Sequence, residues 1–127
     1  MSIAHVTLAT RDVIATRKFF AETLGWQPIE RPGNIEAAGA WLSIAPGQEL
    51  HLLHVDDFEP SPYEREFGRH VAVEYPRDGF AALQERLVAH GAELIHPQRE
   101  TPFERFFFRD PNGYVMEVVD ANRVAEV

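Results

Sequence analysis

The feature that most constrains the fold of this chain is an internal repeat with a spacing of about 66 residues. Residues 5–29 begin with His-Val and contain an Arg-Asp pair and then a Gly, and residues 70–95 repeat this order with one inserted residue. Further along, residues 46–55 align without a gap with residues 112–121. Self-similarity at a fixed spacing indicates repeated supersecondary units. The sequence therefore predicts two copies of one module.

Each copy is predicted to contain one strand, one helix and then three strands. Alternating apolar and polar residues indicate the strands, and Asp12 and Gly25 have the residue types that begin and end a helix. A second helix is expected between Asp78 and Gly91. The predicted strands cover residues 2–9, 27–31, 37–44 and 49–55 in the first copy, and 69–75, 93–96, 105–109 and 114–120 in the second.

Turn residues connect these strands and complete the fold prediction. Asp-Pro-Asn-Gly at 110–113 predicts a hairpin between two apolar strands, and Pro-Gly-Asn at 32–34 predicts a turn in the first copy. Neither copy can bury a sheet face alone, so the two are expected to share one core. We predict an α+β fold in which two βαβββ modules form curved sheets around a shared cavity.

The predicted domain organisation is a single domain, residues 1–127, because this length is typical of one hydrophobic core. Module one covers residues 1–55 and module two covers residues 69–121, with a C-terminal tail at 122–127. Between the modules, residues 56–68 are acidic, contain proline and lack periodicity, which is typical of a linker.

Composition excludes several classes of partner. A formal net charge of −8 disfavours binding to nucleic acid and to anionic membrane surfaces. No apolar run approaches the ~20 residues of a membrane span, and the first residues lack the pattern of a signal peptide, so a cytoplasmic location is expected. The chain has no cysteine, so a metal ion would depend on histidine and carboxylate ligands.

Four polar residues occupy symmetric positions in strands that are otherwise apolar. His5 and His70 share one position of the repeat, and His51 and Glu117 share another. Three imidazoles and one carboxylate suit a divalent ion such as zinc, nickel, manganese, cobalt or iron(II). Taken singly, each is more often a satisfied core residue or a solvated one, but their pairwise placement favours a metal site. No metal role is predicted for the three unpaired histidines, His54, His90 and His96.

Candidates for substrate binding and proton transfer are less distinctive. Trp41 and Phe107 could line an apolar pocket, although strand aromatics are more often core residues. Arg105 could hold an anionic group of a substrate, although solvation at the surface is the better interpretation. The first candidate for a general base is Glu117, and His51 and Glu74 are weaker candidates. For Glu74, solvation is the better interpretation.

Several motifs resemble those of the vicinal oxygen chelate superfamily, which includes glyoxalase I, fosfomycin-resistance enzymes, extradiol dioxygenases and bleomycin-resistance proteins. They are IAHVTLATRDV, FFAETLGW, GRHVAVEY and above all FFFRDPNGYVMEVVD, and the resemblance covers residues 2–121. It implies that His5, His70 and Glu117 match the family's metal ligands. His51 matches a fourth position, which is glutamate in many glyoxalase I proteins and is not a ligand in three-ligand members.

The resemblance implies a metal-dependent, glyoxalase-like isomerase or lyase, similar to lactoylglutathione lyase. Its small substrate would chelate the ion through adjacent oxygens, and the chain would form a homodimer, with the site within one chain or shared between two. An iron(II) extradiol dioxygenase and a fosfomycin-type thiol transferase are alternative enzymes. A metal-free protein that binds drugs, as bleomycin-resistance proteins do, is the alternative of another class. A histidine at position 51 weakens the implication of glyoxalase activity in particular.

Overall fold

The structure, a computed structural model, describes residues 1–30 and 39–123 and divides the chain into two compact units, Met1–Phe58 and Glu59–Val127. The elements of the first unit are β1 (His5–Thr10), α1 (Val13–Thr23), β2 (Gln27–Ile29), β3 (Gly39–Ala45) and β4 (Gln48–His54). Those of the second unit are β5 (Val71–Tyr75), the 3-10 turn η1 (Arg77–Gly79), α2 (Phe80–Ala89), β6 (Glu93–Ile95), β7 (Arg105–Arg109) and β8 (Val115–Asp120).

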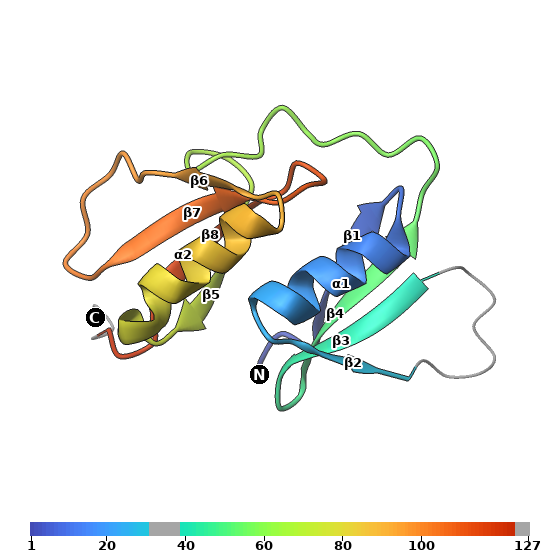
Figure 1. Cartoon of the computed structure of the whole chain (residues 1–127), viewed down its shortest axis with the longest axis horizontal. Helices are drawn as coiled ribbons and strands as arrows, with labels where there is room; N and C mark the ends of the chain where they lie inside the picture. Colours follow the sequence, from blue (N-terminus) through green and yellow to red (C-terminus); the bar gives the residue numbers. More distant parts are fainter. Residues whose placement is uncertain (31–38, 124–127) are drawn as a thin grey trace. The chain divides into compact units, whose positions relative to one another are not determined.

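The two units have the same sheet topology. The strand order is β1-β4-β3-β2 in the first unit and β5-β8-β7-β6 in the second. In each sheet the first pair of strands is parallel and the other pairs are antiparallel. Figure 1 shows one helix against each sheet. This arrangement confirms the α+β fold with two βαβββ modules, while the shared cavity stays a prediction.

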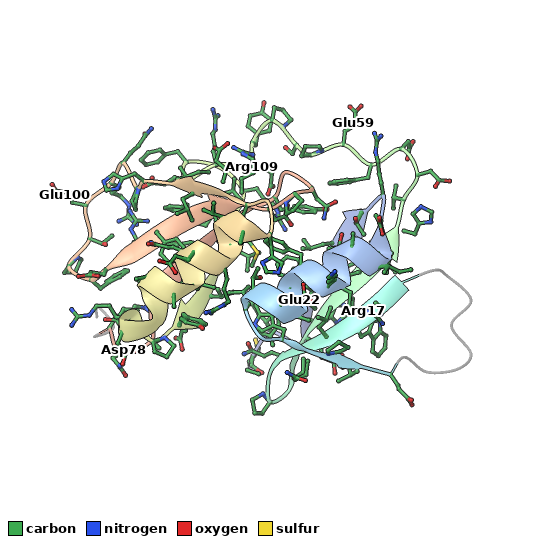
Figure 2. The ribbon with its side chains drawn as sticks, viewed as in Figure 1. Arg17, Glu22, Glu59, Asp78, Glu100 and Arg109 are labelled. Atoms are coloured by element: carbon green, nitrogen blue, oxygen red, sulfur yellow. The ribbon has the colours of Figure 1, made fainter. Side chains whose placement is uncertain are left out.

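The helix of the first unit begins and ends at the residues that the sequence indicated. The Asp12 side chain accepts a hydrogen bond of 2.9 Å from the Ala15 backbone N–H, and Gly25 follows the helix with a φ of +75°. Its outer surface carries Arg17 and Glu22, which are exposed (Figure 2). The helix of the second unit starts differently, because η1 precedes it and Gly79 forms no side-chain cap.

Each unit buries one face of its sheet beneath its helix. In the first unit this core includes Leu8, Phe19, Phe20, Leu42, Leu50 and Leu52, and in the second it includes Leu83, Leu87, Phe106, Phe108 and Val118. Because neighbouring residues of a strand point to opposite faces, the residues between these core positions lie on the other face. His51 lies between Leu50 and Leu52, and Glu117 lies next to Val118, so the predicted ligands occupy the face away from the helix.

Residues 59–68, predicted as part of a linker, belong to the second unit in the structure. Glu64 is only 3% exposed, and its Oε1 accepts hydrogen bonds from Arg69 Nη1 at 3.0 Å and from the Val115 backbone N–H at 2.9 Å. These bonds connect the segment, which was expected to be a linker, to the start of β8.

The predicted hairpin at residues 110–113 is confirmed by the antiparallel pairing of β7 with β8. Gly113 has a φ of +98°, which favours glycine at this turn. The predicted turn at 32–34, the adjoining strand ends and the last tail residues lie outside the described residues. No described helix is long and apolar enough to cross a membrane.

Candidate metal site

The second unit brings His70 and Glu117 together. His70 immediately precedes β5, and Glu117 lies in β8 opposite Ala72, so both side chains extend from neighbouring parallel strands. His70 Nε2 lies 3.3 Å from Glu117 Oε1. The Phe107 ring, on the strand next to Glu117, meets the His70 ring edge to face at 5.1 Å between centroids. Two of the four predicted ligands are therefore in contact within this unit.

A second partner fixes the orientation of each of these two side chains. His70 Nδ1 lies 3.2 Å from the backbone carbonyl oxygen of Arg65, and a carbonyl only accepts, so Nδ1 carries the donated proton. Glu117 Oε2 accepts a hydrogen bond of 2.9 Å from Arg105 Nη1. In neutral His70 this leaves the Nε2 lone pair facing Glu117 Oε1. Two facing acceptors need either a second proton or a cation between them.

Arg105 is buried between two carboxylates. Its side chain is 3% exposed, and its two Nη atoms reach Glu117 Oε2 at 2.9 Å and Glu66 Oε2 at 3.1 Å. The Nη2 atom also donates to the Arg99 carbonyl oxygen, and the guanidinium lies 5.2 Å from the Phe107 ring centroid. Its Nε has no hydrogen-bond partner among the described residues. Surface solvation, the interpretation that the sequence favoured for Arg105, is therefore wrong.

Glu66 comes from the segment expected to be a linker. Its carboxylate accepts hydrogen bonds from the Gln98 and Arg99 backbone N–H groups at 2.7 and 3.0 Å, in addition to the one from Arg105. Desolvation raises the pKa of Glu66, but these hydrogen bonds and the Arg105 charge outweigh it and hold the pKa below its usual value. Two carboxylates around one guanidinium leave a net negative charge, which favours a bound cation.

In the first unit, His5, His51 and Trp41 form a stack of three rings. The centroids of His5 and His51 lie 4.0 Å apart at an interplanar angle of 14°, and those of His51 and Trp41 lie 4.0 Å apart at 5°. The register explains the contact of Trp41 with His51, because these residues are opposite each other on β3 and β4, whereas His5 is two residues before Thr7, the β1 residue opposite His51. The other two predicted ligands, His5 and His51, are therefore in contact with each other.

The stack does not present both imidazoles to one ion as it stands. The lone pair of an imidazole nitrogen lies in the ring plane, so the lone pairs of parallel rings do not converge. In addition, His51 Nε2 lies 2.9 Å from Glu49 Oε1, which occupies that nitrogen. The exposed His5 ring has more freedom to turn than His51, whose side chain is 14% exposed.

The chemistry of the four side chains fits a divalent ion, but only the pair in the second unit has a geometry that suits binding of one ion. A separation of 3.3 Å suits two ligands with metal bonds of about 2.0–2.2 Å. Within residues 1–30 and 39–123, the structure gathers no group of three or more His, Asp or Glu side chains that could hold a metal ion. The predicted ligands thus occur as two pairs, one in each unit.

The other predicted site residues have mixed surroundings. Trp41 is partly exposed beside His51, whereas Phe107 is fully buried. Glu74 is exposed and pairs with Arg123 at 3.0 Å, in agreement with its solvated interpretation. A groove of about 590 Å³ lies beside α2 in the second unit, and neither Phe107 nor Glu117 lines it. Its floor and rim include Phe80, Gln84, Arg99, Phe103, Arg105 and Phe106.

Sequence reasoning missed two carboxylates that contact the candidate ligands or their partners. Glu49 shares a strand face with His51, so period-2 alternation is the signal that indicates their contact. Glu66 lies in an aperiodic segment, and no local pattern connects it with Arg105, 39 positions later. Only the tertiary structure identifies it.

Comparisons with known proteins agree with this architecture. The family model described as Glyoxalase/Bleomycin resistance protein/Dioxygenase superfamily matches residues 2–118. A relative from Arabidopsis thaliana, Glyoxylase I 4, is 25% identical over 99% of this chain and 74% of its own length.

Solved structures have the same fold. A glyoxalase/dioxygenase from Nostoc punctiforme superposes with a TM-score of 0.76 at 21% identity, covering 96% of this chain and 92% of its own. A fosfomycin resistance protein, FosX, from Listeria monocytogenes superposes with a TM-score of 0.74 at 19% identity, covering 100% and 95%. At these identities the structural likeness establishes the fold.

Proposed function

Because this chain belongs to the Glyoxalase/Bleomycin resistance protein/Dioxygenase superfamily, we propose that it is a metal-dependent enzyme of glyoxalase type. Its substrate is a small molecule that chelates a divalent ion through adjacent oxygens, and its reaction is an isomerisation or a lyase step. The proposed ligands are His5, His70 and Glu117, with His51 at the fourth position. They come from one chain or from the two chains of a homodimer.

One observation carries this proposal: His70 Nε2 and Glu117 Oε1 face each other at 3.3 Å while their other atoms are occupied. The Arg65 carbonyl sets the imidazole tautomer, and Arg105 holds the second carboxylate oxygen. Outer partners of this kind orient the ligands of a metal. His70 and Glu117 would hold a divalent ion of zinc, nickel, manganese, cobalt or iron(II), which would satisfy both acceptors.

The ion, when bound, supplies Lewis-acid stabilisation of negative charge that develops on the substrate oxygens. Glu117 was the first candidate for the base of an isomerisation, but its bond to the buried Arg105 opposes detachment. We therefore place Glu117 among the ligands. His51, whose Nε2 lies 2.9 Å from Glu49, is the better proton acceptor, because a carboxylate that accepts from one ring nitrogen leaves the other free to take a proton.

Metal binding by purified protein tests this proposal. Chelator-treated wild-type protein is titrated with zinc, nickel, manganese, cobalt and iron(II), in parallel with His70→Ala and Glu117→Gln. We expect both variants to bind the preferred ion more than about 100-fold more weakly than the wild type. This loss exceeds the usual effect of removing a residue that only orients a ligand. His54→Ala is the matched control, because His54 is exposed and pairs only with Asp56 among the described residues. Wild-type protein that binds none of these ions contradicts the proposal.

His51 has a separate expected result. Because Glu49, Trp41 and His5 already contact His51, we expect His51→Ala to weaken metal binding less than His70→Ala does. Turnover of the metal-loaded His51→Ala protein should nevertheless fall by about 100-fold, the usual range for losing a general base. Equal metal loss in the two variants would identify His51 as a full ligand.

A panel of substrates then separates the reaction classes. Hemithioacetals test the glyoxalase reaction, fosfomycin with a thiol tests the transferase reaction, and catechols with oxygen test the dioxygenase reaction. The fold shared with FosX is the reason to include the second test. Tight binding of an aromatic drug by metal-free protein, with no turnover in any assay, would favour the drug-binding alternative.

A further inference from the structure

The segment that joins the two modules reaches the candidate ligands of the second unit through Arg105. Residues 59–70 supply Glu66, the Arg65 carbonyl and His70 itself, all within one unit. Glu66 is anchored independently of the ligands, because two backbone N–H groups at positions 98 and 99 donate to it. Glu66 is therefore a fixed carboxylate beside a buried guanidinium.

The guanidinium is divided between two carboxylates. Arg105 Nη1 donates to Glu117 at 2.9 Å, whereas Nη2 donates to Glu66 at 3.1 Å and to the Arg99 carbonyl oxygen, and Nε has no partner among the residues that the structure describes. An arginine that faces a single carboxylate usually binds both of its oxygens with two parallel N–H groups. Here Glu117 receives only one, and its Oε1 remains directed at His70.

We propose that Glu66 is a positioning residue that holds Nη2 of Arg105 away from Glu117, so that Glu117 Oε1 stays free to bind a metal ion. This role rests on the proposed metal site and adds a residue to it. Without the Glu66 charge, only the Arg99 carbonyl holds Nη2, and we expect Arg105 to bind both oxygens of Glu117 and to cover the one that faces His70. Glu66 thus sets the metal affinity through Arg105 and touches neither ligand.

Zinc affinity, measured by competition with a chromogenic chelator, tests this role. We expect Glu66→Gln to bind zinc about tenfold more weakly than the wild type, as outer-partner changes do. Glu104→Gln is the matched control, because it removes the same charge beside Arg105 from a side chain that is 67% exposed. The control should stay within about twofold of the wild type, as expected for a surface charge.

A double-mutant cycle separates action through Arg105 from a general effect on the loop at 98–99. In an Arg105→Met background, Glu66→Gln should leave the zinc affinity unchanged within about twofold, because the coupling is lost. If Arg105→Met does not fold, Arg105→Lys replaces it, since an ammonium lacks the two-armed geometry. The visible absorption of bound Co²⁺ should differ from wild type in Glu66→Gln and not in Glu104→Gln.

The outcomes distinguish the positioning role from the metal site itself. Equal zinc affinities for Glu66→Gln and Glu104→Gln, or a Glu66 effect that persists without Arg105, overturn the positioning role and leave the metal site standing. A wild-type protein that binds neither zinc nor cobalt removes the metal site, and the role of Glu66 with it.

Discussion

At the scale of single residues, Asp110 accepts backbone hydrogen bonds that favour its charged form, while its burial disfavours that form. It is 3% exposed, and its Oδ1 accepts hydrogen bonds from the Asn112 and Tyr114 backbone N–H groups, both at 2.9 Å. Burial raises the pKa of Asp110 to about 6 against the lowering effect of these bonds, and nearby Glu64 raises it further. An unfolded aspartate has a pKa of about 3.9.

The native state therefore binds the Asp110 proton more tightly than the unfolded state, and this group lowers stability as pH rises from about 4 to about 6. Asp110→Asn keeps an Oδ1 acceptor and removes the charge. We expect its free energy of unfolding, relative to wild type, to increase across that window by up to about 3 kcal/mol. Urea unfolding between pH 4 and 8 measures this, with Asp120→Asn, at the half-buried last residue of β8, as the control. A difference that does not vary with pH would show that ionised Asp110 is tolerated without loss.

Single residues also show how far the sequence predicts the site. The symmetric positions of His5, His51, His70 and Glu117 were visible in the repeat, because each copy uses the same strand positions. Their contacts agree with that symmetry inside each unit, but their role as ligands stays a prediction. Glu66 and the buried state of Arg105 could not be predicted, because they depend on a segment without periodicity packing onto the second sheet.

At the scale of elements, the repeat predicts similar helix starts, and the structure shows two different ones. Asp12 accepts from the Ala15 N–H and caps α1. Asp78, its counterpart, lies within η1, and α2 starts from Gly79 without a side-chain cap. The sequence could not indicate this difference, because a 3-10 turn inserted before a helix changes neither the apolar spacing nor the residue type at the cap.

This difference predicts unequal effects of the same substitution. Asp12→Ala should destabilise the protein by about 1 kcal/mol, the usual effect of losing an N-cap. Asp78→Ala should change stability by less than about 0.5 kcal/mol, as surface substitutions do. Chemical denaturation of both variants provides the measurement. Equal losses at the two positions would indicate that Asp78 caps its helix in solution.

At the scale of the whole molecule, duplication predicted the architecture most completely. Both units repeat one strand order, and the turn at 110–113 and the glycine after α1 are where the sequence indicated. The sequence did not indicate that the second half of the expected linker belongs to the second unit. There, Glu64 and Glu66 accept hydrogen bonds from residues of that unit. Acidic composition alone does not distinguish a solvated segment from one whose carboxylates are buried in specific hydrogen bonds.

The central claim is that His5, His70 and Glu117 are ligands of one divalent ion. The most direct test is the metal stoichiometry of purified wild-type protein, His5→Ala and Glu117→Gln, measured by elemental analysis after equilibration with the preferred ion. We predict one ion per chain in the wild type and close to none in either variant, because each variant breaks the same site. Two ions per chain in the wild type, or full occupancy in both variants, would contradict it.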